Sequence, residues 1–78
     1  MICPPTAGYY DMIVLPHKPK VANTRGSAFI GRGADNPMYA PVELRDDSHG
    51  YIYFSPECIA KYNGLTVGIR MEFSYTIE

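Results

Sequence analysis

The side chains that could carry out acid–base, nucleophilic or metal chemistry are few in this chain of 78 residues: two cysteines, two histidines and eight carboxylates. They show no His-x-x-x-His or Cys-x-x-Cys metal spacing, and no Gly-x-Ser-x-Gly nucleophile motif occurs. Cys58 follows a helix-start signal and is expected to be a buried apolar residue rather than a nucleophile. Asp46 and Asp47 are adjacent and are expected in a turn. The sequence therefore predicts no enzyme, no metal site and no cofactor.

Two stretches combine aromatic residues with arginine: RGSAFIGR at residues 25–32 and, after a gap, HGYIYFS at residues 49–55. If the aliphatic residues of each stretch point inward, alternation along a strand turns Phe29, Tyr51 and Tyr53 outward. Every nucleobase has a face that stacks on an aromatic ring, at about 1–3 kcal/mol per base. The pattern indicates a platform for unpaired bases, and its alternative is ordinary sheet packing in a small barrel.

The same stretches resemble the two ribonucleoprotein motifs of cold-shock domains. RGSAFI is similar to the Lys-Gly-Phe-Gly-Phe-Ile core of the first motif, and HGYIYFS is similar to the Asp-Val-Phe-Val-His-Phe-Ser of the second. LTVGIRMEF looks like the family's late Leu-x-x-Gly-x-x-Val-x-Phe strand. The three similar stretches occur in the same order as in the family and cover most of residues 25–78. The resemblance implies an OB-type barrel that binds single-stranded RNA or DNA with little sequence preference. Carried over by position, its binding face would hold Arg25, Phe29, Tyr51, Tyr53 and Phe54, with Phe54 on the face or packed beneath it.

Net charge is only −1, but it is divided unevenly along the chain. Residues 1–32 carry four cations and one carboxylate, whereas residues 33–78 carry three cations and seven carboxylates. An anionic ligand would therefore meet the first half, where Lys18 and Lys20 lie in a Pro-rich loop that is expected to project. We expect these lysines and Arg25 to contact phosphates, so that affinity falls as salt rises. A loop kept polar for solubility is the alternative.

A second function class fits the same residues: a small viral or mobile-element module that binds a host or virion protein through a tyrosine-rich surface. Tyrosine suits a protein interface because it gives a large contact area and a polar tip at a low rotamer cost. The low positive charge, the absence of tryptophan and the serine at position 27 favour this alternative. Salt dependence discriminates the two, since an aromatic protein interface responds weakly to salt.

Short runs rich in Val, Ile, Tyr, Phe and Thr, separated by Gly and Pro, predict a mostly β fold. The expected strands are residues 9–15, 26–31, 38–44, 51–54 and 65–78, and the last alternates most strictly. Pro41 is expected to make the third run an edge strand or a strap. Ser55 as N-cap, Pro56 after it and the Asn63–Gly64 stop predict one short helix. We expect a small five-stranded OB-like β-barrel with one short helix, the alternatives being an open sheet with one helix or an SH3-like barrel.

The length predicts a single domain, with an extended arm at residues 1–7 and one barrel at residues 8–78. No apolar run has the length of a membrane span, and no signal peptide is recognised, so a cytoplasmic chain with reduced cysteines is expected. A Cys3–Cys58 disulfide is the alternative for a secreted chain. The expected partner is single-stranded RNA or DNA, or else a protein. Either a monomer or a homodimer is compatible with so small a core.

Overall fold

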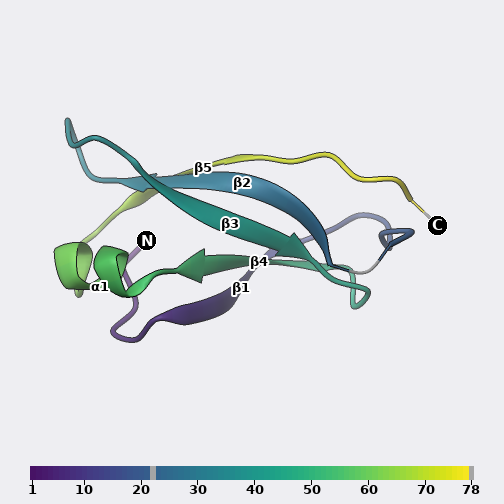
Figure 1. Cartoon of the computed structure of the whole chain (residues 1–78), viewed down its shortest axis with the longest axis horizontal. Coiled ribbons are helices and arrows are strands. Elements are labelled where there is room, and N and C mark those ends of the chain that lie inside the picture. The colour runs from purple at the N-terminus through teal and green to yellow at the C-terminus, as the bar shows by residue number, and fades with distance from the viewer. Residues whose placement is uncertain (22, 78) are drawn as a thin grey trace.

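The computed structural model describes residues 1–21 and 23–77, and the described chain forms five strands and one helix (Figure 1). The strands are β1 (Gly8–Val14), β2 (Thr24–Gly31), β3 (Met38–Leu44), β4 (His49–Phe54) and β5 (Gly68–Glu72). Helix α1 (Pro56–Tyr62) connects β4 to β5. The predicted fold class, mostly β with five strands and one short helix, is confirmed.

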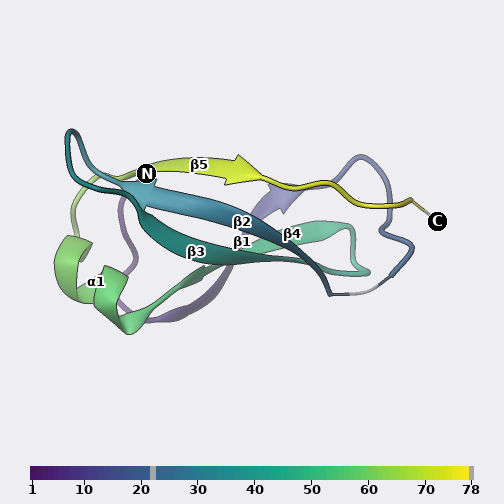
Figure 2. The ribbon, with the colours of Figure 1, turned by 45° about the horizontal axis from the view of Figure 1, so that its top comes forward.

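All strand pairs are antiparallel, and the order across the sheet is β1-β4-β3-β2-β5. Strands β2, β3 and β4 follow one another as hairpins, and β5 returns after the helix to lie beside β2, which is the Greek-key arrangement. The sheet curls into a half-barrel that is open between β1 and β5 (Figure 2). At this level it is a small, partly open β-barrel-like fold with five strands.

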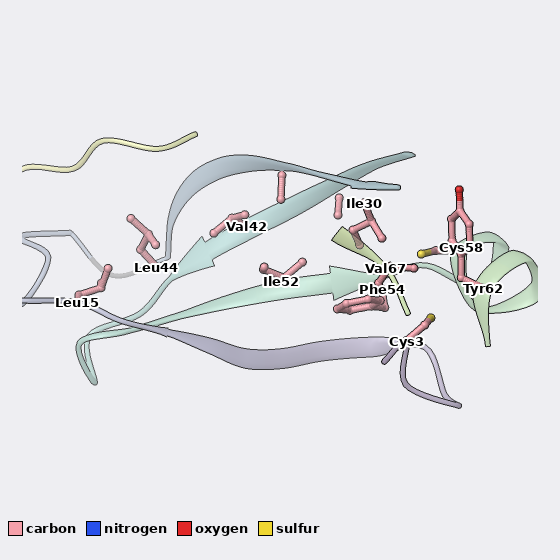
Figure 3. Close-up of a cluster of buried hydrophobic side chains, with 12 residues drawn as sticks. Cys3, Leu15, Ile30, Val42, Leu44, Ile52, Phe54, Cys58, Tyr62 and Val67 are labelled. Carbon is pink, nitrogen blue, oxygen red and sulfur yellow. The ribbon is translucent and has the colours of Figure 1, made fainter. Parts of the chain in front are cut away.

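The core lies on the inner face of the curl, where alternate residues of each strand are buried (Figure 3). On β4, Ile52 and Phe54 are fully buried, and on β2 the inward residues are Ala28 and Ile30, as alternation predicted. Figure 3 shows Cys58 and Tyr62 of the helix beside Val67 and Cys3 at one end of this core. The remaining members of the buried cluster are Leu15, Ala40, Val42 and Leu44.

Helix α1 begins and ends where its capping residues predicted. The Ser55 hydroxyl accepts a hydrogen bond from the Cys58 backbone N–H at 3.2 Å, and Pro56 occupies the first turn, where no backbone donor is needed. Asn63 is the C-cap, and Gly64 follows with φ of 76°, a left-handed conformation that favours glycine. The expected burial of Cys58 on the inner side of the helix is also confirmed.

The prediction that Pro41 places its strand at an edge is wrong, because β3 lies between β2 and β4. Pro41 has no backbone N–H, and the effect of this missing donor is nevertheless visible in how β3 pairs with β4. The backbone N–H of Arg45 bonds to His49 on β4, so alternation points the nitrogen of Pro41 toward β4 as well. Pairing between β3 and β4 runs only from Val42 to Leu44, and it therefore stops beside Pro41.

The predicted fifth strand, residues 65–78, is longer than the observed one. Strand β5 ends at Glu72, and Phe73, on the apolar face of the predicted strand, is exposed. Residue 78 lies outside the described residues. Ile69 and Tyr75 of the predicted strand's apolar face pack against the core, and Phe73 lies beside Gly26 of β2 but stays partly exposed.

Both segments that flank β1 pair with the C-terminal part of the chain. Met1 exchanges backbone hydrogen bonds with Val67 at 2.7 and 3.0 Å, so the N-terminal arm lies on the barrel, and its Cys3 joins the core. The Lys20 backbone N–H donates to the Thr76 carbonyl at 2.7 Å, and the Tyr75 hydroxyl donates to the His17 carbonyl at 3.0 Å. The loop expected to project is therefore tied to the C-terminal segment.

The two cysteines are free thiols that lie next to each other in the core. Burial raises the pKa of the Cys3 thiol, and a hydrogen bond with Cys58 opposes this shift. Burial likewise raises the pKa of Cys58. Both side chains are thus held in the protonated, unreactive form.

Candidate functional site

The outer face of the sheet gathers three tyrosines from two neighbouring strands. Tyr9 of β1 lies directly opposite Tyr53 of β4, and their rings are 5.1 Å apart at a tilt of 50°. Tyr51 and Tyr53 alternate with the buried residues of β4, so both are turned away from the core. We call these three residues, with Arg25 of β2, Glu43 of β3 and Arg45 directly after β3, the tyrosine face. The outward orientation predicted for Tyr51 and Tyr53 is confirmed.

Arg45 stacks on this face rather than extending into solvent. Its guanidinium carbon lies 3.8 Å from the centre of the Tyr51 ring and 5.5 Å from that of Tyr9. Its Nε donates a hydrogen bond to a Glu43 carboxylate oxygen at 2.8 Å, and that bond raises the pKa of Arg45. The cation–π contact with Tyr51 and the ion pair with Glu43 together hold Arg45 in place. One side of the Tyr51 ring is therefore already covered by the guanidinium group.

Arg25 is the more accessible arginine of the face. One of its terminal nitrogens is 3.4 Å from the Tyr9 hydroxyl and 3.9 Å from Glu43, and 65% of its side chain is exposed. These long contacts fix the direction of the side chain while leaving most of its N–H donors open to solvent. Arg25 is therefore available to an anionic or carbonyl-bearing ligand.

The carboxylates beside the tyrosines each have a partner. Asp11 of β1 accepts a hydrogen bond from His49 Nδ1 at 2.8 Å, and that bond raises the pKa of the imidazole. Asp47, in the turn before β4, accepts from the Tyr51 hydroxyl, which lowers the pKa of the carboxyl and raises the pKa of the phenol. The turn thus anchors Tyr51 at its hydroxyl end, and the negative charges on the face are locally compensated.

Replacing Asp11 with asparagine is expected to lower the pKa of His49. Because folding raises this pKa above its ordinary value of 6.5, protonated His49 stabilises the fold fully below that pH. The contribution is lost as the pH rises through the pKa of the folded chain. An NMR titration of the His49 ring protons measures the change. Asp47→Asn is the control and should lower the pKa less, since Asp47 acts on the imidazole through charge alone. An unchanged pKa in Asp11→Asn would contradict the pairing.

A second pair of aromatic rings lies further along the same outer face. Phe29 of β2 is directly opposite Tyr39 of β3, with ring centroids 6.0 Å apart in a T-shaped arrangement. Both rings are exposed. Phe29 also borders an open groove of about 630 Å³, whose other lining residues include Arg70, Glu72, Asp35 and Pro37. The small residues Ser27 and Pro41 are opposite each other between the two aromatic pairs.

The predicted site residues fall into three places. Arg25, Phe29, Tyr51 and Tyr53 share the outer face. Phe54 is fully buried and packs edge-on against Tyr10 at 5.5 Å, so it supports the sheet from beneath, the second of its two expected positions. Lys18 and Lys20 lie in the loop that is tied to the C-terminal segment. Figure 1 places this loop and the β3–β4 turn at the same end of the molecule, away from the helix.

Three members of this surface, Tyr9, Tyr39 and Arg45, are not among the residues predicted from the sequence. Alternation in the first and third strands carried a signal for the two tyrosines, because each is next to an inward residue. No local signal existed for Arg45, since its position over Tyr51 depends on how the β3–β4 turn folds back.

Among residues 1–21 and 23–77, no group of three or more His, Cys, Asp and Glu side chains is placed to hold a metal ion. No helix of the same residues has the length and apolarity needed to cross a bilayer. Comparison of the chain with protein-family models, curated proteins and solved structures finds no match. The resemblance to cold-shock domains therefore rests on the residues alone and stays a prediction.

Proposed function

We propose that the protein binds single-stranded RNA or DNA with little sequence preference through the outer face of its sheet. The observation that carries this proposal is the presence of two exposed aromatic pairs, Tyr9–Tyr53 and Phe29–Tyr39, on one surface with the accessible Arg25. Next to Phe29 and Tyr39 along their strands, Ser27 and Pro41 are opposite each other, and such small side chains leave room for a nucleic-acid strand to follow the sheet. No cofactor is needed for this activity.

Stacking and charge both support the proposal. Each ring can stack on a base without selecting its identity, which gives affinity without sequence preference. Glu43 is paired with Arg45, and Asp11 and Asp47 are hydrogen-bonded to His49 and Tyr51, so fewer carboxylate lone pairs on this face point freely at a ligand. Arg25 supplies a phosphate or cation–π contact, and Lys20 is exposed at the same end of the sheet. Tyr51 has a lesser role than the sequence implied, because Arg45 already covers its ring.

Replacing Phe29 with alanine is expected to weaken binding to oligo-dT and oligo-U by about 1–3 kcal/mol, because one stacking surface is removed. Fluorescence anisotropy at low salt, with protein free of carried-over nucleic acid, measures this loss, and Tyr53→Ala should act similarly. Leu65→Ala is the matched control, since Leu65 is also an exposed apolar residue but lies beside the N-terminal arm, away from the outer face. Affinity should fall as salt rises. Equal losses for Phe29→Ala and Leu65→Ala would reject the site.

A protein partner is the second candidate, and the pairing of charges on the tyrosine face favours it. Arg45, Glu43, Asp11 and Asp47 neutralise one another or are hydrogen-bonded to neighbours, so the face is rich in tyrosine and arginine without being basic. Tyrosine and arginine are the residues that most often dominate protein interfaces. If no oligonucleotide binds even at low salt, this face would instead be assigned to a protein partner.

A further inference from the structure

The outer edge of β5 is open over a defined length. On one side β5 pairs with β2, and on the other side no strand lies beside it within the described part of the chain (Figures 1 and 2). Just before β5, Val67 is paired with Met1. The N-terminal arm thus covers the start of this edge and leaves β5 itself uncovered on that side.

The backbone of β5 directs hydrogen-bonding groups into this opening. The N–H and the carbonyl of Val67 both bond to Met1, on the side away from β2. Successive residues of a strand alternate the side to which their N–H and C=O point. Ile69 and Met71 therefore direct their N–H and C=O groups to the same side as Val67, where none of residues 1–21 and 23–77 forms a strand paired with β5.

Other unpaired segments of this sheet carry a bulge or a proline that hinders pairing with another chain, whereas β5 carries neither and its two charged residues, Arg70 and Glu72, are opposite in sign. Strand β1 has an irregular register between Asp11 and Ile13, and a bulge together with a charged side chain blunts an edge. The unpaired half of β3 contains Pro41, which lacks a donor. Strand β5 has neither a bulge nor a proline, and 41% of Met71 is exposed on its apolar side. Such an edge is a template for an added strand.

We propose that a second copy of this chain pairs with β5 in antiparallel fashion, with the two-fold axis at Met71. In this register Arg70 is directly opposite Glu72 of the partner subunit, and the symmetry repeats the pair. Opposite charges directly across two strands stabilise the pairing, whereas a register centred on Arg70 or on Glu72 would oppose like charges. Of these three registers, only the one centred on Met71 places opposite charges of the two β5 strands across from each other.

The side chains that this register requires are free to take part. Arg70 and Glu72 of one chain are 3.7 Å apart, with 82% and 70% of their side chains exposed, so their mutual ion pair is weak and can be exchanged. On the other side of the strand, Ile69 would face Phe73 of the partner subunit, and the two Met71 side chains would meet at the axis. Dimerisation would thereby cover the apolar face that the half-barrel leaves open.

Charge exchange between two variants tests this inference directly. Arg70→Glu alone and Glu72→Arg alone each place like charges opposite one another in a homodimer, so each is expected to be monomeric. A mixture of the two variants restores both opposite-charge pairs and is expected to form a heterodimer. An ion pair within one chain could not be rescued by mixing. Native mass spectrometry with one variant isotopically labelled identifies the heterodimer, and sedimentation velocity follows the wild-type dimer over a range of concentrations.

Several outcomes would overturn the inference. A wild-type chain that stays monomeric at the highest soluble concentration would do so, as would single variants that dimerise as well as the wild type. A mixture without heterodimer, when circular dichroism shows both variants folded, would also overturn it. Oligonucleotide binding is measured separately, so the failure of this proposal is distinguishable from the failure of the proposed function.

Discussion

Replacing Phe54 with alanine is expected to destabilise the protein by about 3–5 kcal/mol, the usual cost of removing a buried phenylalanine ring. Phe54 is fully buried and packs against Tyr10 at the centre of a small core. Domains have about 5–15 kcal/mol of stability, and a chain with so small a core lies toward the lower end. The variant should therefore unfold at a much lower urea concentration than the wild type, and far-UV circular dichroism during urea titration measures the shift.

Tyr53→Ala is the matched control, because Tyr53 is the neighbour of Phe54 but belongs to the outer face. Its loss should cost about 1 kcal/mol or less, the range of a cross-strand pair such as that with Tyr9. The two variants thus separate the two sides of β4. Phe54→Ala should lose stability, and Tyr53→Ala should lose oligonucleotide affinity. A stable Phe54→Ala chain with impaired binding would instead place Phe54 in the binding face.

Local features of the sequence predicted those elements whose cause is local. The helix is defined by Ser55, Pro56 and the Asn63–Gly64 stop, which act within a few residues, and each was correctly identified. Alternation along β4 likewise separated the buried Ile52 from the exposed side of the strand, because a strand has a period of two whatever lies beside it. The fold class followed from such elements and their order.

Features that depend on neighbours distant in sequence could not be predicted in the same way. Pro41 forbids one hydrogen bond, and the sequence alone could not show that β4 would pair with only half of β3 and so avoid the conflict. Residues 65–78 have strict alternation, but how far their apolar side is buried depends on what lies against it, and Phe73 stays partly exposed although it lies beside Gly26 of β2. Periodicity identifies the face of a strand, not what covers it.

The same limit applies to the candidate site. The sequence identified Phe29, Tyr51 and Tyr53 because alternation is local, but it missed the groups that modify them. Arg45 over Tyr51 and the pairing of His49 with Asp11, which is 38 residues away, arise from register across the sheet. These contacts decide how much of each ring is exposed: Arg45 covers one side of Tyr51 at 3.8 Å and lies further from Tyr9, at 5.5 Å.

The close approach of β1 to β4 leads to the second large effect. Gly50 is buried in β4, and a β-carbon added there would lie 2.8 Å from Cδ1 and 2.9 Å from Cβ of Ile13, and 3.2 Å from a methyl group of Leu44. Real side-chain contacts are longer, so Gly50→Ala forces the strands apart or drives Ile13 from its position. Overpacking of a core costs about 1–3 kcal/mol. Thermal unfolding monitored by circular dichroism should show a correspondingly lower melting temperature.

Gly68→Ala provides the comparison, because it is also a glycine in a strand and an added β-carbon there meets no atom nearer than 3.9 Å. That change should be neutral or slightly stabilising, since alanine reduces the conformational entropy of the unfolded chain. Adding Ile13→Val to Gly50→Ala removes Cδ1 but keeps Cβ, so it should recover only part of the lost stability, as coupling between touching residues requires. If Gly50→Ala and Gly68→Ala melted alike, Ile13 could not lie against Gly50 in the observed register.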